Sequence, residues 1–195
     1  MIYDALLWTD LETTGVEPDA RVIEIAMVPT TFDADFRPLS EPFHAVIHYG
    51  SDLRVADVDP FVLAMHAKNG LWEEASDASL TPAKMGNELR VAIANWDLKG
   101  EISLAGRSVH NDRRWLENFL SPSLFAELRL GHRHFDLTPV KKFAEMAGIE
   151  VDVEQTDEHR AIYDVLADIE LARKLVKAAR TPRLGDAGAS QTRYT

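Results

Sequence analysis

The pattern of apolar and polar residues predicts β-strands in the first quarter of the chain. Residues 6–16 form an apolar run that ends in two carboxylates and a glycine, which is typical of a buried strand entering a turn. Residues 22–30 and 43–49 are two further runs rich in apolar and β-branched residues. Because turn-forming residues separate the three runs, we expect an antiparallel meander.

From residue 57 onwards, the apolar residues mostly recur at helical spacing. Two short helices are expected on either side of Asn69-Gly70, and Thr81-Pro82 begins a helix that runs to about Trp96. The remaining elements expected are strands at 101–106 and 134–138, helices at 110–120 and 139–147, a loop around Pro122, and a last long helix ending near Arg180. This order predicts an α/β domain whose mixed central sheet, three antiparallel strands plus parallel ones, is flanked by helices.

Length and composition favour one domain. The chain has 195 residues, of which 46% are hydrophobic, and this is enough to bury a core. We expect the domain to occupy residues 1–180. Residues 181–195 are rich in glycine, serine and threonine and offer little to bury, so we expect a disordered tail. The sequence has no run of about 18 apolar residues, so no membrane span is expected.

Charge and cysteine content narrow the class of function. A net charge of −11 argues against a protein that coats long nucleic acid by charge alone, but it allows an enzyme that handles nucleic acid through bound metal ions. The absence of cysteine excludes disulfides and thiolate zinc sites, and it is compatible with a reducing cytoplasm. The first residues contain no basic leader, so we expect a cytoplasmic protein without a signal peptide.

The first candidate chemistry lies at the end of the first predicted strand. Asp10 and Glu12 are two residues apart, so both side chains point to the same face of that strand. Two neighbouring carboxylates repel one another unless a positive charge lies between them. Divalent cations such as Mg²⁺ and Mn²⁺ prefer carboxylate oxygen. On this pair alone, a solvated turn remains an alternative to a metal site.

Further acids and a histidine lie at the boundaries of later elements. Asp112 is near the start of a predicted helix, and Asp164 is in the last helix, five residues after His159. Five residues turn a helix by about 140°, so His159 and Asp164 would diverge if both were helical. We therefore expect His159 in the loop before the helix, over a site that Asp164 lines. Asp168, one turn later, is expected to be solvated.

Several sequence blocks resemble the DEDD superfamily of 3′→5′ exonucleases, in the subclass whose last motif is H-x4-D. TDLETTG (9–15), SVHNDRRWL (108–116) and HRAIYD (159–164) resemble its first, second and last motifs. MHAKNGL (65–71) and HRHFDLTPVKKFAEMAG (132–148) resemble segments of the oligoribonuclease family within that superfamily. The matches are in order and cover roughly residues 5–178. The resemblance implies a ribonuclease H-like (DnaQ-like) fold.

The resemblance also implies an activity and its catalytic residues. Enzymes of this family are metal-dependent 3′→5′ exoribonucleases that hydrolyse short oligoribonucleotides to nucleoside 5′-monophosphates. Two divalent ions about 3.5–4 Å apart can activate a water and stabilise the charge on the departing 3′ oxygen. The implied ligands of two Mg²⁺ or Mn²⁺ ions are Asp10, Glu12, Asp112 and Asp164. His159 is the implied base, because a histidine accepts protons near neutral pH.

Substrate contacts also follow from the resemblance. It places Val16 and Phe61 against the bases, His66 and Ser108 around the substrate, and Arg133 and Thr138 at the terminal 5′ phosphate. Stacking on an aromatic side chain contributes roughly 1–3 kcal/mol per base. The alternative for Val16 and Phe61 is an ordinary place in the core.

Departures from the family leave other functions open. Arg107 replaces its asparagine, His132 its tyrosine and Pro139 its threonine or serine, all near the substrate, so a preference for dinucleotides stays open. Thr13, after Glu12, is more like proofreading exonucleases, which favours single-stranded DNA or longer RNA as an alternative substrate. A nucleotide-binding module without catalysis is a third possibility. The resemblance further implies a homodimer that shares residues 129–138 across its interface.

Overall fold

The structure of this chain is a computed structural model that describes residues 5–151 and 159–181. The tail expected at 181–195 lies outside the described residues except for Thr181. The described strands are β1 (Ala5–Thr13), β2 (Val22–Thr31), β3 (Phe43–Val46), β4 (Ile102–Gly106) and β5 (Leu130–Asp136). The described helices are α1 (Pro60–Lys68), α2 (Leu71–Asp77), α3 (Pro82–Trp96), α4 (His110–Phe119), α5 (Pro122–Glu127), α6 (Leu137–Met146) and α7 (Ala161–Arg180), with short 3₁₀ turns at Gly50–Asp52 and Val55–Asp57.

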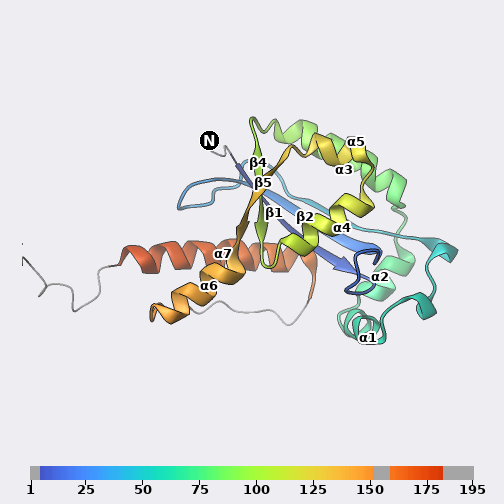
Figure 1. The fold of residues 1–195 in the computed structure, drawn as a ribbon. Helices are drawn as coiled ribbons and strands as arrows, with labels where there is room; N and C mark the ends of the chain where they lie inside the picture. The colour runs from blue at the N-terminus through green and yellow to red at the C-terminus, as the bar shows by residue number, and fades with distance from the viewer. Residues whose placement is uncertain (1–4, 152–158, 182–195) are drawn as a thin grey trace, which may run out of the picture.

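The strands form one mixed sheet with the order β3-β2-β1-β4-β5 (Figure 1). β1 pairs antiparallel with β2, and β2 pairs antiparallel with β3, as the three apolar runs predict. β4 lies parallel to β1, and β5 lies parallel to β4. The predicted α/β fold with a mixed central sheet is therefore confirmed.

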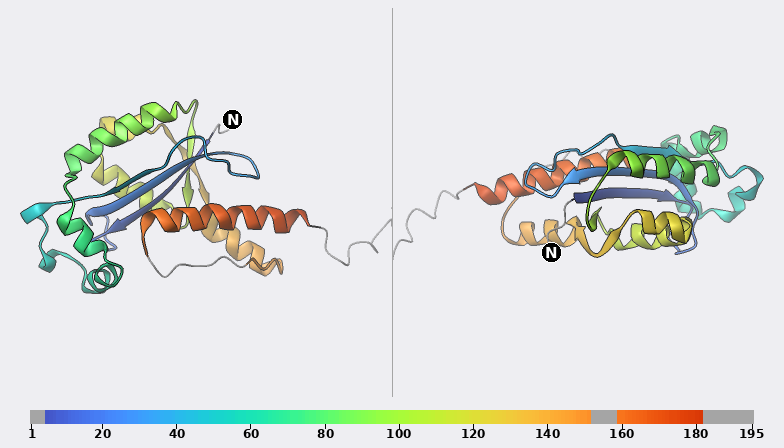
Figure 2. Two further views of the ribbon diagram at one scale, coloured as in Figure 1. Left: turned by 180° about the vertical axis from the view of Figure 1, so that it is seen from behind. Right: turned by 90° about the horizontal axis from the view of Figure 1, so that it is seen from above.

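Helices cover both faces of the sheet, and alternate residues of β1 reach the two hydrophobic clusters. Leu7 and Leu11 belong to a cluster with residues of α3, α4 and α5. Leu6 and Trp8 point to the other face and pack with residues of α6 and α7. The long helix α7 runs along this second face, with α6 beside it (Figures 1 and 2). The sheet is thus buried on both faces, which explains why β1 and β2 are almost continuously apolar.

Local signals at helix starts account for most of the boundaries. The Thr81 hydroxyl accepts a hydrogen bond from the Lys84 amide at the start of α3, as the threonine–proline signal predicts. The expected loop around Pro122 is wrong, because Ser121 caps the short helix α5 in the same way. The start expected at residue 139 is also wrong, because α6 begins at Leu137 and Asp136 is its cap.

None of the helices that the structure describes is both long enough and apolar enough to cross a membrane. The longest of them, α7, carries charged residues along its length and packs against β1 and β2. It is an amphipathic helix of a globular domain, and its buried side includes Val165, Ile169 and Leu175.

Candidate active site

The carboxyl end of β1 positions the first two carboxylates of the site. Asp10 and Glu12 follow Leu6 and Trp8 on the alternating pattern of β1, so they face the side of the sheet that α7 covers. Asp164 comes from the first turn of α7. One carboxylate oxygen of each of Asp10, Glu12 and Asp164 lies within 4.8 Å of the other two. The structure thus brings together three of the four metal ligands predicted from the sequence.

The fourth predicted ligand, Asp112, reaches the same site from the next parallel strand. Because β1 and β4 are parallel, their carboxyl ends meet at one edge of the sheet, and α4 begins just after β4. The strands approach closely there: a Cβ on Gly106 would lie 2.9 Å from the Thr9 carbonyl oxygen. Asp112 is buried, and its charge acts on Asp10.

Burial and mutual repulsion disfavour the charged forms of these acids. Burial raises the pKa of Asp10, and the charges of Asp112 and Glu12 raise it further. Burial, with the charge of Glu24, raises the pKa of Glu12 to about 8. Burial also raises the pKa of Asp112 to about 8, although backbone N–H donors oppose this shift. In a chain without a bound cation, the site would therefore take up protons at neutral pH.

The donor set fits a hard divalent cation. The grouped ligand atoms are all carboxylate oxygens, which is the ligand chemistry of Mg²⁺, Mn²⁺ and Ca²⁺ rather than of thiolate-bound zinc. A divalent ion would also relieve the repulsion that raises the pKa values of these acids. The residues of this site therefore support dependence on a divalent metal ion.

A fully buried carboxylate on β2 anchors the start of α7. Glu24 lies directly opposite Glu12 in the β1–β2 pair and has no exposed surface. Its carboxylate accepts hydrogen bonds from Arg160 Nε at 3.1 Å and from the Ala161 amide at 3.0 Å, and it pairs with His44 Nε2 at 2.7 Å. Burial acts to raise the pKa of Glu24, but the bonds from His44 and Arg160 hold it below its usual value. Glu24 therefore stays charged and fixes the first turn of α7 to the sheet.

His159 lies in the loop before α7, as its spacing from Asp164 predicts. It is exposed, and its backbone adopts the left-handed conformation with φ of 41°. Its carbonyl oxygen accepts a hydrogen bond of 2.7 Å from Asn69 Nδ2, at the end of α1. The imidazole lies close enough for its charge to act on Asp164. Contacts on both sides of His159, to α1 and through Arg160 to Glu24, thus hold it next to the carboxylates.

The prediction that Asp168 is solvated is wrong. Its residue surface is only 6% exposed, and Arg107 Nε donates to its carboxylate at 2.5 Å. Arg107 Nη2 also donates to Asp164, at 3.4 Å. Burial raises the pKa of Asp168 to about 6, while the pairing with Arg107 opposes that shift. Sequence spacing missed this pair because its members are 61 residues apart along the chain.

The predicted base contacts are on the surface, not in the core. Val16 is 70% exposed and Phe61 is 79% exposed, which excludes the alternative that they are core residues. Their segments are linked, because the Asp59 amide donates to the Thr14 carbonyl at 2.9 Å, and Asp59 caps α1 at Phe61. His66 is different, since its side chain is fully buried and its Nε2 donates to the Thr13 carbonyl at 3.0 Å. It lies 3.9 Å from Glu12 and braces β1 from behind.

Two of the predicted phosphate-end residues contact each other. The Ser108 amide donates to Thr138 Oγ1 at 3.0 Å and to Asp136 Oδ1 at 3.1 Å. The hydroxyls of Ser108 and Thr138 are 3.2 Å apart. Ser108 takes a positive φ of 52°, which turns the chain from β4 into α4. Arg133 is exposed on β5. The structure therefore joins Ser108 to Thr138 and leaves the role of Arg133 a prediction.

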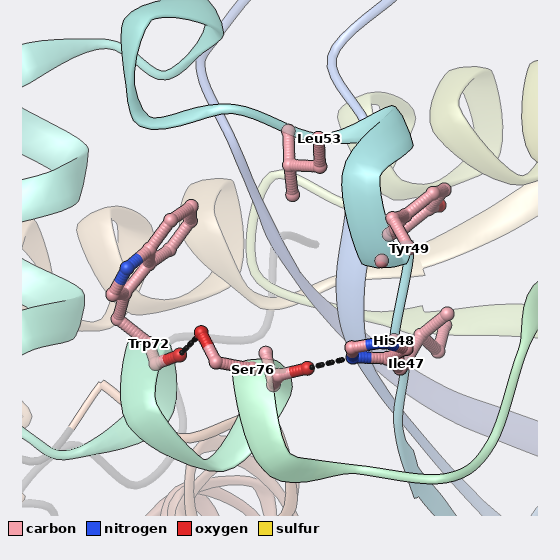
Figure 3. Close-up of a pocket in the computed structure, with 8 residues that line it drawn as sticks. Ile47, His48, Tyr49, Leu53, Trp72 and Ser76 are labelled. Atoms are coloured by element: carbon pink, nitrogen blue, oxygen red, sulfur yellow. Dashed lines mark hydrogen bonds between the residues drawn. The ribbon is translucent and has the colours of Figure 1, made fainter.

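A separate cavity of about 190 Å³ lies between the segment after β3 and helix α2 (Figure 3). Its lining includes Tyr49, Leu53 and Trp72, and none of its lining residues is a carboxylate. His48 Nδ1 bonds with the Ala75 carbonyl at 3.0 Å across its floor. This cavity therefore does not share the chemistry of the carboxylate site.

Comparison with known proteins decides the family. The family model described as Exonuclease (RNase_T) matches residues 7–172, which include every carboxylate of the site. The chain belongs to the exonuclease family. Oligoribonuclease from Neisseria meningitidis serogroup A is 30% identical over 171 residues, which cover 86% of this chain and 88% of that protein. Oligoribonuclease from Corynebacterium diphtheriae is 32% identical over 171 residues, which cover 85% and 79% of the two chains. The resemblance inferred from the sequence motifs is confirmed.

Solved structures confirm the fold. The exonuclease chain is similar to the zinc-bound E. coli exonuclease I–single-stranded DNA complex, with a TM-score of 0.67 at 21% identity. The match covers 95% of this chain and 43% of that one. Exonuclease I from Methylocaldum szegediense gives a TM-score of 0.62 at 20% identity, covering 92% and 41%. The chain thus spans about two fifths of the length of these structures, and the ribonuclease H-like fold is confirmed.

The raised pKa values predict that the exonuclease loses stability as pH rises when a chelator keeps metal away. Glu12 and Asp112 have folded pKa values of about 8, against about 4 in an unfolded chain. Between these values the folded state holds more protons, so the free energy of unfolding falls by about 1.4 kcal/mol per pH unit for each such proton. Urea denaturation in EDTA between pH 5 and 8 measures this slope.

Two changes to that experiment should act in opposite ways. Adding Mg²⁺ or Mn²⁺ should stabilise the protein more at pH 8 than at pH 5, because protons compete with the cation for the carboxylates. The Asp112→Asn variant should show a shallower slope in EDTA, since one of the shifted groups no longer titrates. Equal slopes for the two proteins would contradict the shifts assigned to this site.

Glu24→Gln should destabilise the exonuclease by about 3 kcal/mol, because it leaves Arg160 without its buried charge partner. Urea denaturation at constant pH measures the change in the free energy of unfolding. Glu127→Gln is the matched control, because it breaks an exposed pair with Arg90 and should cost less than about 1 kcal/mol. A loss no larger than that of the control would show that Glu24 does not anchor α7.

Proposed function

We propose that this chain is a divalent-metal-dependent 3′→5′ exoribonuclease that hydrolyses short RNA, down to dinucleotides, to nucleoside 5′-monophosphates. The observation that carries the proposal is the cluster of Asp10, Glu12 and Asp164, with Asp112 and His159 beside it. Relatives named oligoribonuclease align with most of this chain, and their alignments span more than three quarters of their own lengths. Both lines of support refer to the same domain.

The proposed metal ligands are Asp10, Glu12, Asp112 and Asp164, and the proposed ions are two Mg²⁺ or Mn²⁺. Such ions, when bound, lower the pKa of a coordinated water and stabilise the charge on the departing 3′ oxygen. The chain supplies oxygen ligands from three separate elements, β1, α4 and α7, and two of those elements are fixed to the sheet. The ligands are therefore held in place before any ion arrives.

His159 is the proposed general base. Its exposed imidazole stands at the entrance to α7 and can take the proton from an attacking water without leaving its loop. The bond from Asn69 Nδ2 to the His159 carbonyl holds the backbone and leaves the imidazole to act on the water. The product then carries its phosphate on the 5′ oxygen of the released nucleotide.

The exposed apolar residues fit the proposed base contacts. Val16 and Phe61 offer a wedge and an aromatic face beside the end of β1, where stacking is tolerant of base sequence. His66 supports this end of the site from within, through its bond to Thr13. Ser108, Arg133 and Thr138 are proposed to hold the terminal 5′ phosphate, as hydroxyl and guanidinium donors suit phosphate oxygens.

We further infer a homodimer in which residues 129–138 face the partner subunit. This segment contains β5, which is at the edge of the sheet and has a neighbour on one side among the described strands. The adjoining α6 exposes Phe143 and Met146, two large apolar side chains. An unpaired strand edge next to exposed apolar residues is a surface that association would protect.

Incubation with Mn²⁺ and 5′-labelled RNAs of two to ten nucleotides tests the proposed function. Wild-type protein should release nucleoside 5′-monophosphates from the 3′ end, fastest on the shortest RNAs. His159→Ala should slow this release by about 10²–10⁴-fold, the usual contribution of a general base. Because His159 is exposed, the variant should keep the thermal stability of the wild type.

Three controls give that assay its meaning. Asp33→Asn alters an exposed carboxylate far from the cluster in the sequence and should leave the rate unchanged. EDTA should abolish turnover. Single-stranded DNA of matched lengths tests the alternative substrate, and a strong preference for DNA would contradict the proposal. Full activity of Asp112→Asn would contradict the metal assignment.

A Phe143→Glu/Met146→Glu variant should shift the protein from dimer to monomer, because it places charges on the exposed apolar face of α6. Light scattering over a range of protein concentrations measures the mass. Val91→Glu is the control, since it charges an exposed apolar residue of α3 instead. A monomeric wild-type mass at assay concentration would contradict the inferred homodimer.

A further inference from the structure

An arginine lies within the acidic site and is held by two of its carboxylates. Arg107 follows the last residue of β4, and its guanidinium donates through Nε to Asp168 at 2.5 Å and through Nη2 to Asp164 at 3.4 Å. The Asp168 side chain is almost fully buried, whereas a third of the Arg107 side chain is exposed. The pair therefore has a buried anchor and a cation that reaches the open site.

The two hydrogen bonds of Arg107 differ in strength. A charge-assisted N–H···O bond normally measures about 2.7–2.9 Å, so the contact with Asp168 is tight and the contact with Asp164 is loose. A guanidinium has five N–H donors, and these two bonds use two of them. Asp164 is also a proposed metal ligand, so an ion bound there would draw its charge away from Arg107. Asp168 would keep the guanidinium in place.

The backbone on both sides of Arg107 is fixed. Gly106 lies so close to β1 that a Cβ there would meet the Thr9 carbonyl at 2.9 Å. The Ser108 amide is bonded to Thr138 and to Asp136. A donor on such a turn loses little freedom when it binds a ligand, which is how preorganised phosphate sites gain affinity.

Charge also favours a phosphate as the ligand of Arg107. Five carboxylates surround this part of the site: Asp10, Glu12, Asp112, Asp164 and Asp168. Arg160, a second cation near Asp164, is engaged by Glu24 and Glu74. Arg107 stands between the carboxylates and the Ser108–Thr138 pair, along the direction that a nucleic-acid strand would take from the metal ligands to the proposed 5′-phosphate end.

We propose that Arg107, anchored by Asp168, binds a non-bridging oxygen of the phosphodiester that the enzyme cleaves. This inference rests on the proposed function, because it assigns a substrate contact to the same site. Asp168 is a positioning residue, since it acts through the guanidinium. The pair supplies a fixed positive charge where the chain otherwise presents only acids to an anionic substrate.

The test uses a variant that removes the charge without leaving a buried carboxylate unpaired. Arg107→Gln/Asp168→Asn replaces the ion pair with two amides of similar size, in a His159→Ala background that slows hydrolysis. With Mn²⁺ and a pentaribonucleotide, fluorescence anisotropy should show Kd raised by about tenfold or more, the worth of one hydrogen bond to a charged group. Arg90→Gln/Glu127→Gln removes an ion pair between α3 and α5 and should leave Kd unchanged.

A neutral linkage in the RNA identifies which phosphate is bound. When a methylphosphonate replaces the 3′-terminal phosphodiester, the double variant and its parent should bind with the same Kd, because the partner of Arg107 has lost its charge. Circular dichroism and thermal unfolding should show that the double variant folds as its parent does. Arg107→Lys should recover part of the affinity, since it restores the charge without the planar fork.

Two results would overturn the inference. One is a folded double variant that binds the unmodified RNA as tightly as its parent. The other is a loss of affinity that persists with the methylphosphonate RNA, because the guanidinium would then act elsewhere. Failure of the wild-type protein to release mononucleotides from RNA would instead refute the proposed function. Normal wild-type turnover with either of the first two results would refute only the role of Arg107.

Discussion

The repulsion among carboxylates at the carboxyl end of β1 is the constraint on which the site depends. Asp10 and Glu12 are held on one face of a strand whose other residues are core, and Asp112 and Asp164 arrive from helices that pack on the same sheet. Burial raises the energy of their charged forms, so the fold holds this arrangement at a cost. Only a cation or protons can relieve the repulsion, and a divalent ion does so without neutralising the acids as ligands.

Glu24 shows how the fold sustains that repulsion. It adds a further negative charge directly across from Glu12, and this charge raises the pKa of Glu12. In return, its hydrogen bonds to Arg160 and to the Ala161 amide set the first turn of α7, which carries Asp164. The position of a metal ligand on the last helix thus depends on a buried charge on the second strand. Packing alone leaves a helix free to slide by a fraction of a turn, whereas this bond network does not.

Local patterns were enough to predict most of the fold and the metal end of the site. Strand alternation put Asp10 and Glu12 on one face, and helix geometry put His159 in the loop before α7, as the structure has it. These inferences succeed because they use the repeat of a single element. The start of α6 was misplaced because two caps compete there: Asp136 accepts the Thr138 amide and begins the helix two residues before the threonine–proline signal.

Side-chain partners across elements lay beyond such reasoning. Asp168 is one turn from Asp164, and helix periodicity alone gave no reason to bury it. Its burial follows from Arg107, which β4 delivers to α7 from 61 residues away. The same crossing explains why an arginine is tolerated where the resemblance expects an asparagine: a buried carboxylate holds the added charge in place. A residue that departs from the family pattern therefore has to be interpreted with the partner that the fold gives it, and here that partner directs the cation towards the phosphate path.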